Sequence, residues 1–104
     1  MRPQSRRQER LADLLKRRIS EAILQEVQDP RIGFVTITGV NLSGDLRIAQ
    51  VYVSVLGDEK RALETLQALQ HARRFLERTM FRTLGLKMPV ELRFRFDESL
   101  ERAA

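Results

Sequence analysis

Apolar residues in this sequence recur with two different periods, and the order of those periods limits the fold to one class. Over about 6–28 they recur every three or four residues, which is typical of an amphipathic helix. This helix should end before Pro30, because the residue preceding a proline is driven out of the helical conformation. Two runs rich in β-branched residues follow at 34–40 and 46–55, joined by turn-forming residues at 41–45. They predict an antiparallel hairpin.

The second half of the chain repeats this change of period. The helical period returns over 58–84, with or without a break near Ala72. Strict alternation over 90–97 then predicts a last strand, whose buried face carries Val90, Leu92, Phe94 and Phe96. The resulting order of elements indicates an α+β fold, with a three-stranded sheet and helices packed on one face.

The length and composition of the chain fit one small domain. We expect a single domain over 1–104, with flexible ends at 1–5 and 98–104. The absence of cysteine excludes disulfides and thiolate catalysis. No apolar run approaches the ~20 residues that span a bilayer, and no apolar stretch typical of a secretory signal follows the basic N-terminal residues. We therefore expect a cytoplasmic protein with no membrane partner.

The charge of the chain is strongly basic. Lys+Arg is 19 and Asp+Glu is 14, which gives a net charge of +5 and a sequence pI near 10.7. The basic residues are arginine, apart from Lys16, Lys60 and Lys87. Because the arginine fork binds phosphate and stacks on bases, nucleic acid is the leading partner. The alternatives are a basic protein whose charge serves solubility, or a codon bias toward arginine.

The sequence shows no constellation of residues suited to catalysis or metal binding. Its only histidine, His71, has no nucleophile signature around it. The acids of the first helix are interleaved with basic residues, as in surface pairs. The five glycines are scattered and form no phosphate-binding loop. We expect a protein that is not an enzyme and uses no metal, cofactor or small-molecule substrate.

One segment of the chain concentrates the basic residues. Residues 70–89 contain one acid, Glu77, and five basic residues: Arg73, Arg74, Arg78, Arg82 and Lys87. Arg74, Arg78 and Arg82 are four apart and so line one helix face. With His71 and Phe75 beside it, this row resembles a surface for single-stranded or looped RNA. The alternative is a solvated helix face. We expect Phe75 and Phe81 to lie in the core.

Other arginines are weaker candidates for RNA contact. Arg6, Arg7 and Arg10 could form a phosphate-binding arm at the start of the first helix, although an ordinary solubilising end fits equally well. Arg31 lies in a predicted turn at 29–31 and is a further candidate, because loops often carry binding residues.

Several motifs together resemble the ribosome-binding factor A family. They are the Asp-Pro-Arg turn at 29–31, the Leu-Ser-Gly-Asp-Leu turn at 42–46 and the Ala-Gln-Val-Tyr-Val strand at 49–53. A Phe-x-x-Asp-x-Ser ending follows at 94–99. The likeness covers about 6–100, and the motifs are specific in combination.

This resemblance implies a type II KH-like fold, in the order α-β-β-α-kink-α-β. It also implies binding to the free small ribosomal subunit and its rRNA. The implied role is late maturation, including 5′-end processing of that rRNA, and it is often needed for growth in the cold. We further expect a monomer, because no extended apolar face remains once the core is assigned.

Two positions depart from the family's pattern. The family has Ala-x-Gly at the bend between its last two helices, and here Arg74 stands at the glycine position after Ala72. Glycine adopts a positive φ at low cost and arginine does not, so the bend should be milder or built differently. Pro89 comes one position earlier than the family's proline, which should shift the entry to the last strand. Both departures weaken a residue-by-residue transfer of the RNA site.

Three other functions compete with ribosome assembly. A general single-stranded RNA-binding module would bind free oligonucleotides as well as subunits. A protein-interaction domain would show no RNA affinity at moderate salt. An RNA-processing enzyme would need a catalytic group, for which His71 is the only histidine available.

Overall fold

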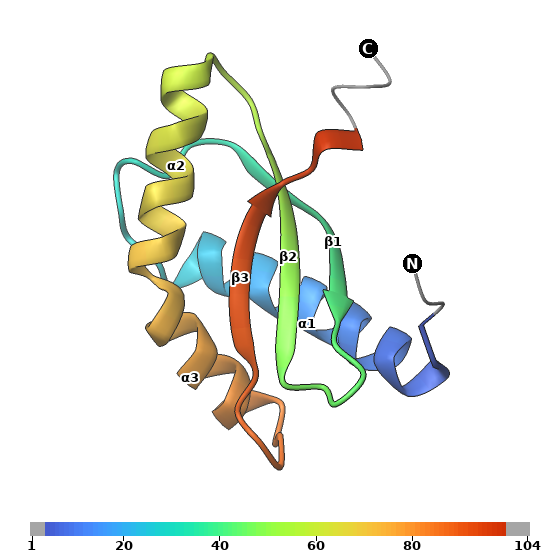
Figure 1. Cartoon of the computed structure of the whole chain (residues 1–104). Helices are drawn as coiled ribbons and strands as arrows, with labels where there is room; N and C mark the ends of the chain where they lie inside the picture. Colours follow the sequence, from blue (N-terminus) through green and yellow to red (C-terminus); the bar gives the residue numbers. More distant parts are fainter. Residues whose placement is uncertain (1–3, 100–104) are drawn as a thin grey trace.

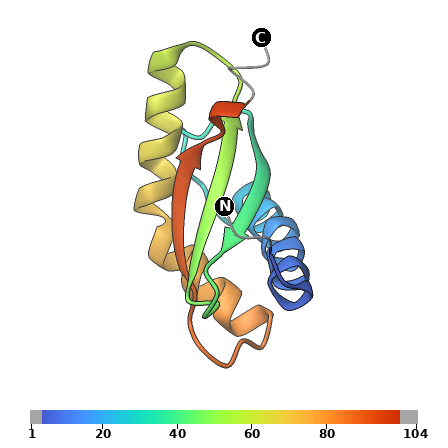
Figure 2. The ribbon, with the colours of Figure 1, turned by 45° about the vertical axis from the view of Figure 1, so that its right-hand side comes forward.

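The computed structural model describes residues 4–99 and contains a mixed three-stranded sheet covered by three helices (Figure 1). The elements, in chain order, are α1 (Arg6–Gln25), β1 (Val35–Leu42), β2 (Ile48–Val55), α2 (Glu59–His71), α3 (Arg73–Thr83) and β3 (Glu91–Phe96). Figure 1 shows α1 crossing behind the strands, with α2 and α3 beside β3, and in Figure 2 α1 lies next to β1 and α2 next to β3. The predicted α+β fold is confirmed, including its order of elements.

The sheet combines an antiparallel hairpin with a parallel crossover. The strand order is β1-β2-β3, in which β2 pairs antiparallel with β1 and parallel with β3. A parallel neighbour requires a long connection, and α2 and α3 supply it across the covered face. The β1–β2 register shifts between Ile37 and Gly39, which marks a bulge in β1.

The core lies between the helices and the covered face of the sheet. Ala49, Val51 and Val53 of β2 are completely buried, whereas the residues between them are half-buried on the other face. Leu15 from α1 and Leu76 from α3 are also completely buried. Burying one such leucine contributes about 1.5–3 kcal/mol. The two periods of the sequence therefore meet in one core.

The first helix is well defined at both ends. Ser5 forms a capping box with Gln8: its hydroxyl accepts from the Gln8 amide at 3.2 Å, and its own amide donates to the Gln8 side chain at 2.8 Å. At the other end, the Val27 amide donates to the carbonyl of Ala22, five residues back, at 3.0 Å. The helix therefore ends at Gln25, earlier than the predicted residue 28.

The chain ends were expected to be flexible over 1–5 and 98–104. Residues 1–3 and 100–104 lie outside the described residues. Within the described part, Ser5 caps α1, and the Gln4 side-chain amide exchanges hydrogen bonds of 3.2 and 3.3 Å with the backbone of Leu42.

The bend between α2 and α3 needs no left-handed residue. Ala72 separates the two helices with φ −83° and ψ −1°, close to helical values. Arg74 is already the second residue of α3, and within residues 4–99 the only non-glycine residue with positive φ is Leu46. The absence of the family's glycine is therefore compatible with the bend.

Two aromatic residues do not lie where we expected them. Phe75 and Phe81 are 38% and 41% exposed, so their assignment to the core was wrong. The buried face of α3 is formed by Leu76, Thr79 and Met80. Each phenylalanine is one position away from this stripe, a rotation of about 100° on a helix, which places its ring at the edge of the interface.

Candidate nucleic-acid interface

The outer face of α3 carries a row of unpaired cations. Arg74, Arg78 and Arg82 are all exposed, and none of them forms an ion pair with another residue in 4–99. They line a shallow cleft of about 510 Å³ together with Glu77, Phe81 and Pro89. The row predicted from the i,i+4 spacing is thus present, with an aromatic ring beside it.

The single acid of α3 has another partner. The Glu77 carboxylate accepts a hydrogen bond of 2.8 Å from the amide of Leu92, which attaches α3 to the beginning of β3. Among residues 4–99, its only ion-pair contact is a long one, 3.9 Å from Arg73, whose side chain is 40% exposed. Glu77 therefore neutralises Arg73 in part and leaves the exposed row unneutralised.

A second basic cleft lies at the beginning of α1. It measures about 660 Å³, and its basic lining residues are Arg6, Arg7, Arg10 and Lys87. The sequence grouped Lys87 with the arginines of α3, but the structure places it across this cleft from the arginines of α1. Seven of the nine predicted residues therefore line two separate clefts, while Arg31 and Arg73 line neither. No sequence signal linked Lys87 to residues some eighty positions away.

The cleft also has an apolar lining that the sequence analysis missed. Leu11 and Leu14 come from α1, Leu46 from the β1–β2 turn, and Leu86, Met88 and Val90 from the segment before β3. Leu11 and Leu14 were assigned only to the apolar stripe of the first helix. Because the other residues come from distant segments, only the tertiary structure brings them together.

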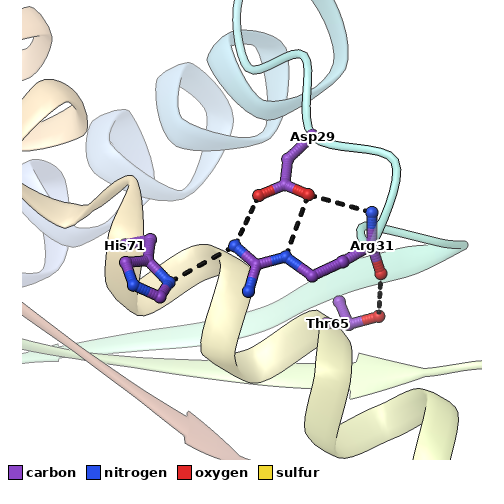
Figure 3. A network of polar contacts seen from close by, with 4 residues as sticks. All are labelled: Asp29, Arg31, Thr65 and His71. Carbon is purple, nitrogen blue, oxygen red and sulfur yellow. Dashed lines mark hydrogen bonds and ion pairs between the residues drawn. The ribbon is translucent and has the colours of Figure 1, made fainter.

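Arg31 is part of an internal network, unlike the cations of the two clefts (Figure 3). Its guanidinium donates to both carboxylate oxygens of Asp29, at 3.1 and 2.7 Å, and to Nδ1 of His71 at 3.3 Å. Its backbone carbonyl accepts from the hydroxyl of Thr65, a completely buried residue of α2, at 3.1 Å. The network attaches the 29–33 loop to α2.

The network also changes the acidity of Asp29. Hydrogen bonds from the Arg31 side chain, followed by one from its backbone amide, lower the pKa of Asp29 from 3.8 to about 2. The charged carboxylate is therefore the form that stabilises the loop. Since Arg31 is paired in this way, its charge is largely neutralised before any ligand arrives.

Residues 4–99 contain neither a metal-binding cluster nor a helix that could span a membrane. No group of three or more histidine, cysteine, aspartate or glutamate side chains lies close enough to hold a metal ion there. Over the same residues, no helix is long and apolar enough to cross a membrane.

Comparisons with known proteins agree on one family. The family model described as "Ribosome-binding factor A" matches residues 7–104. A ribosome-binding factor A from Halothermothrix orenii is 46% identical over 98 residues, which are 94% of this chain and 80% of that protein.

Solved structures of the family have the same fold. The crystal structure of ribosome-binding factor A from Thermus thermophilus is similar, with a TM-score of 0.74 and 31% identity, over 85% of this chain and 93% of that one. A model of the Thermus thermophilus factor fitted into the cryo-EM map of its complex with the 30S subunit is also similar. Its TM-score is 0.68 at 32% identity, over 84% of this chain and 91% of that one.

Proposed function

This chain belongs to the ribosome-binding factor A family, and we propose that it binds the free small ribosomal subunit through its rRNA and assists late maturation. The proposal includes help in processing the 5′ end of that rRNA, in the cytoplasm, with greatest need during growth in the cold. The chain acts in this role as a monomer and by binding alone, without catalysis or a cofactor. The 30S complex of the Thermus thermophilus relative supports the choice of subunit.

The observation that carries the proposal is the unpaired row Arg74, Arg78 and Arg82 beside the half-exposed ring of Phe81. Arginines four apart on a helix present charges about 6 Å apart along its axis, close to the spacing of phosphates along an extended strand. An aromatic ring next to them offers a stacking surface for a base. The face therefore suits single-stranded or looped rRNA.

The remaining predicted contacts differ in their expected strength. Arg73, which Glu77 neutralises in part, adds charge at the beginning of α3, and Arg6, Arg7 and Arg10 form a second anchor together with Lys87. Arg31 contributes least, because Asp29 already binds the Nε and Nη2 groups of its guanidinium. A binding protein of this kind acts by favouring the rRNA arrangement to which it binds most tightly.

A second candidate function is general binding of single-stranded RNA without preference for the ribosome. The cleft that contains Phe81 favours it, because stacking on an aromatic ring tolerates any base. On this alternative the protein binds free oligonucleotides as tightly as it binds subunits.

Co-sedimentation with purified subunits at two salt concentrations tests the proposal. We expect binding to free small subunits, and not to large subunits or joined ribosomes. An Arg74→Glu/Arg78→Glu variant should lose this binding. Equal binding to all particles, or to none, would overturn the ribosomal role.

A matched control separates the α3 face from a general effect of charge. A Lys60→Glu/Arg95→Glu variant makes the same change in net charge at two exposed residues outside both clefts. It should retain binding. Equal loss in both double variants would show that total charge, and not the α3 face, determines the binding.

A further inference from the structure

The cleft at the beginning of α1 has more apolar surface than a phosphate site needs. Leu14 and Met88 are 47% and 53% exposed there, and Leu11, Leu46 and Leu86 are half-buried beside them. A phosphate is fully satisfied by cations and N–H donors and gains nothing from contact with leucine or methionine. Exposed apolar surface with a polar rim is typical of a binding site.

The rim of this cleft is strongly cationic. Arg6, Arg7, Arg10 and Lys87 are all exposed and form no ion pair with another residue in 4–99. Among the described residues, the one acid in the lining is Asp45, whose carboxylate accepts hydrogen bonds of 2.7 Å from the Ser43 hydroxyl and 3.1 Å from the Arg47 amide. The cleft therefore fits a ligand that combines an apolar surface with negative charge.

The backbone is strained where Leu46 enters the cleft. Leu46 has a φ of 62°, which is rare for a residue of its size and costs on the order of 1 kcal/mol or more. The turn holds it in this conformation, because its amide donates to the Ser43 carbonyl at 2.9 Å. A glycine would adopt the same backbone without strain but would remove a side chain from the cleft. Strain of this kind is frequent at ligand-binding sites.

We propose that this cleft holds an unstacked nucleobase of single-stranded RNA against its leucine and methionine side chains, with the adjoining phosphates on the surrounding cations. The proposal rests on the proposed function and specifies what its second anchor recognises. The flat faces of a base are apolar and its backbone is anionic, which matches both parts of the cleft. Arginine, which supplies three of the four cations, can also stack on a base.

The position of the cleft favours RNA over an acidic peptide. Arg82 lies in the last turn of α3, three residues before Gly85, which is part of the cleft lining. A strand that follows the arginine row toward the end of α3 is therefore led to Lys87 and the cleft. One RNA strand can then occupy both clefts, and its regularly repeated phosphates meet cations in each of them.

The proposal can be tested with RNA that lacks bases but keeps its charge. Binding of a fluorescent single-stranded decamer should weaken when its internal bases are removed one at a time. Where the missing base is the one in the cleft, the loss should be roughly 5-fold, the lower end of the range for a base on an aromatic ring, because this lining is aliphatic. Equal affinities for the intact RNA and every abasic RNA would contradict the proposal.

Substitutions in the apolar lining assign the effect to this cleft. A Leu14→Ser/Met88→Ser variant leaves every charge in place. It should lose most of the difference in affinity between the intact RNA and the RNA that lacks the base held in the cleft. The control Leu24→Ser/Leu56→Ser alters two exposed leucines outside both clefts and should keep this difference. If the Leu14→Ser/Met88→Ser variant keeps the full difference in affinity between intact and abasic RNA, the proposal is overturned.

A measurement on the unaltered protein covers the case in which the first variant fails to fold. RNA carrying 4-thiouridine should crosslink to peptides that contain Leu14 or Met88, and crosslinks found only on other peptides would contradict the proposal. So would stronger competition for the cleft by an acidic leucine-rich peptide than by RNA. These assays use free RNA, so they distinguish failure of this proposal from a failure to bind the small subunit.

Discussion

Arg31 and Arg78 are both arginines at the surface of this protein, yet the fold uses them in opposite ways. Arg31 donates to both carboxylate oxygens of Asp29, also contacts His71, and holds the 29–33 loop on α2 (Figure 3). Arg78 lies on the exposed face of α3 and has no ion-pair partner among residues 4–99. The difference shows that the number of arginines says little about binding until their partners within the fold are known.

The same contrast applies to the acids beside these arginines. Asp29 is two residues from Arg31 and neutralises it. Glu77 is one residue from Arg78, but its carboxylate accepts a hydrogen bond from the amide of Leu92 and does not pair with Arg78 among residues 4–99. Salt bridges at the surface contribute little to stability, so such an acid matters here mainly because it determines which cations stay available to an anionic ligand.

The largest expected effect concerns the salt dependence of RNA binding. If about five phosphates are neutralised, log K should fall with log salt at a slope of roughly −3.5 to −4.5, a loss of roughly 100- to 500-fold between about 50 and 200 mM. An Arg74→Glu/Arg78→Glu variant should flatten the slope by roughly 1.5. Arg31→Gln should leave it unchanged, because that charge is already paired. A slope near zero for the unaltered protein would contradict the electrostatic basis of binding.

The next effect concerns stability and the internal network. Thr65→Val removes a completely buried hydroxyl that donates to the Arg31 carbonyl and accepts from the Gly33 amide at 3.4 Å. We expect a loss of about 1–3 kcal/mol in the free energy of unfolding, because both backbone groups lose their partner.

Chemical denaturation measures this loss. Thr83→Val is the matched control, because that hydroxyl only adds a bond to the carbonyl of Thr79, within its own helix. It should leave the stability nearly unchanged. An equal loss in the free energy of unfolding for both variants would show that the contact between Thr65 and the 29–33 loop does not stabilise the fold more than a bond within a helix does.

A smaller effect should appear in the dependence of stability on pH. The pKa of Asp29 is lowered to about 2 by Arg31, so its contribution is present above the unfolded value of 3.8 and is lost as the pH falls from about 3.8 to about 2. The melting temperature of the unaltered protein should therefore exceed that of Asp29→Asn near neutral pH, and the difference should disappear over that interval.

A control carboxylate tests whether this effect belongs to the network. Asp13→Asn alters an exposed acid of α1 that forms no ion pair within residues 4–99. It should show no such pH-dependent difference. If Asp29→Asn and Asp13→Asn behave alike, the contact with Arg31 contributes nothing measurable.

The smallest expected effect is on rRNA processing in a His71→Ala variant. Nδ1 of His71 only accepts a hydrogen bond from Arg31, and no nucleophile contacts the ring among the hydrogen bonds of residues 4–99. We expect 5′-end processing in cells to proceed at an unaltered rate. Loss of processing with intact subunit binding would favour the alternative of an RNA-processing enzyme.

The sequence by itself determined the elements and the layers of this fold. The two apolar periods and the stop before Pro30 placed each helix and strand to within a few residues, because these signals act between near neighbours. The same reasoning found the α3 row, since residues four apart on a helix always share a face. Its failures, such as the exposed ring of Phe75, concern side chains at the edge of an interface, where only the packed neighbours decide the burial.

Tertiary structure alone decided which cations are available and where they meet. No pattern among neighbouring residues shows that the Glu77 carboxylate accepts a hydrogen bond from the amide of Leu92. Nor does any such pattern show that Lys87 and Arg10 line one cleft together with Leu46. These contacts join residues far apart in the chain, and they exist only because the sheet and the α1 helix bring distant segments together. The periods of a sequence report the conformation of neighbouring residues, whereas a binding site depends on the distances between segments that the periods do not encode.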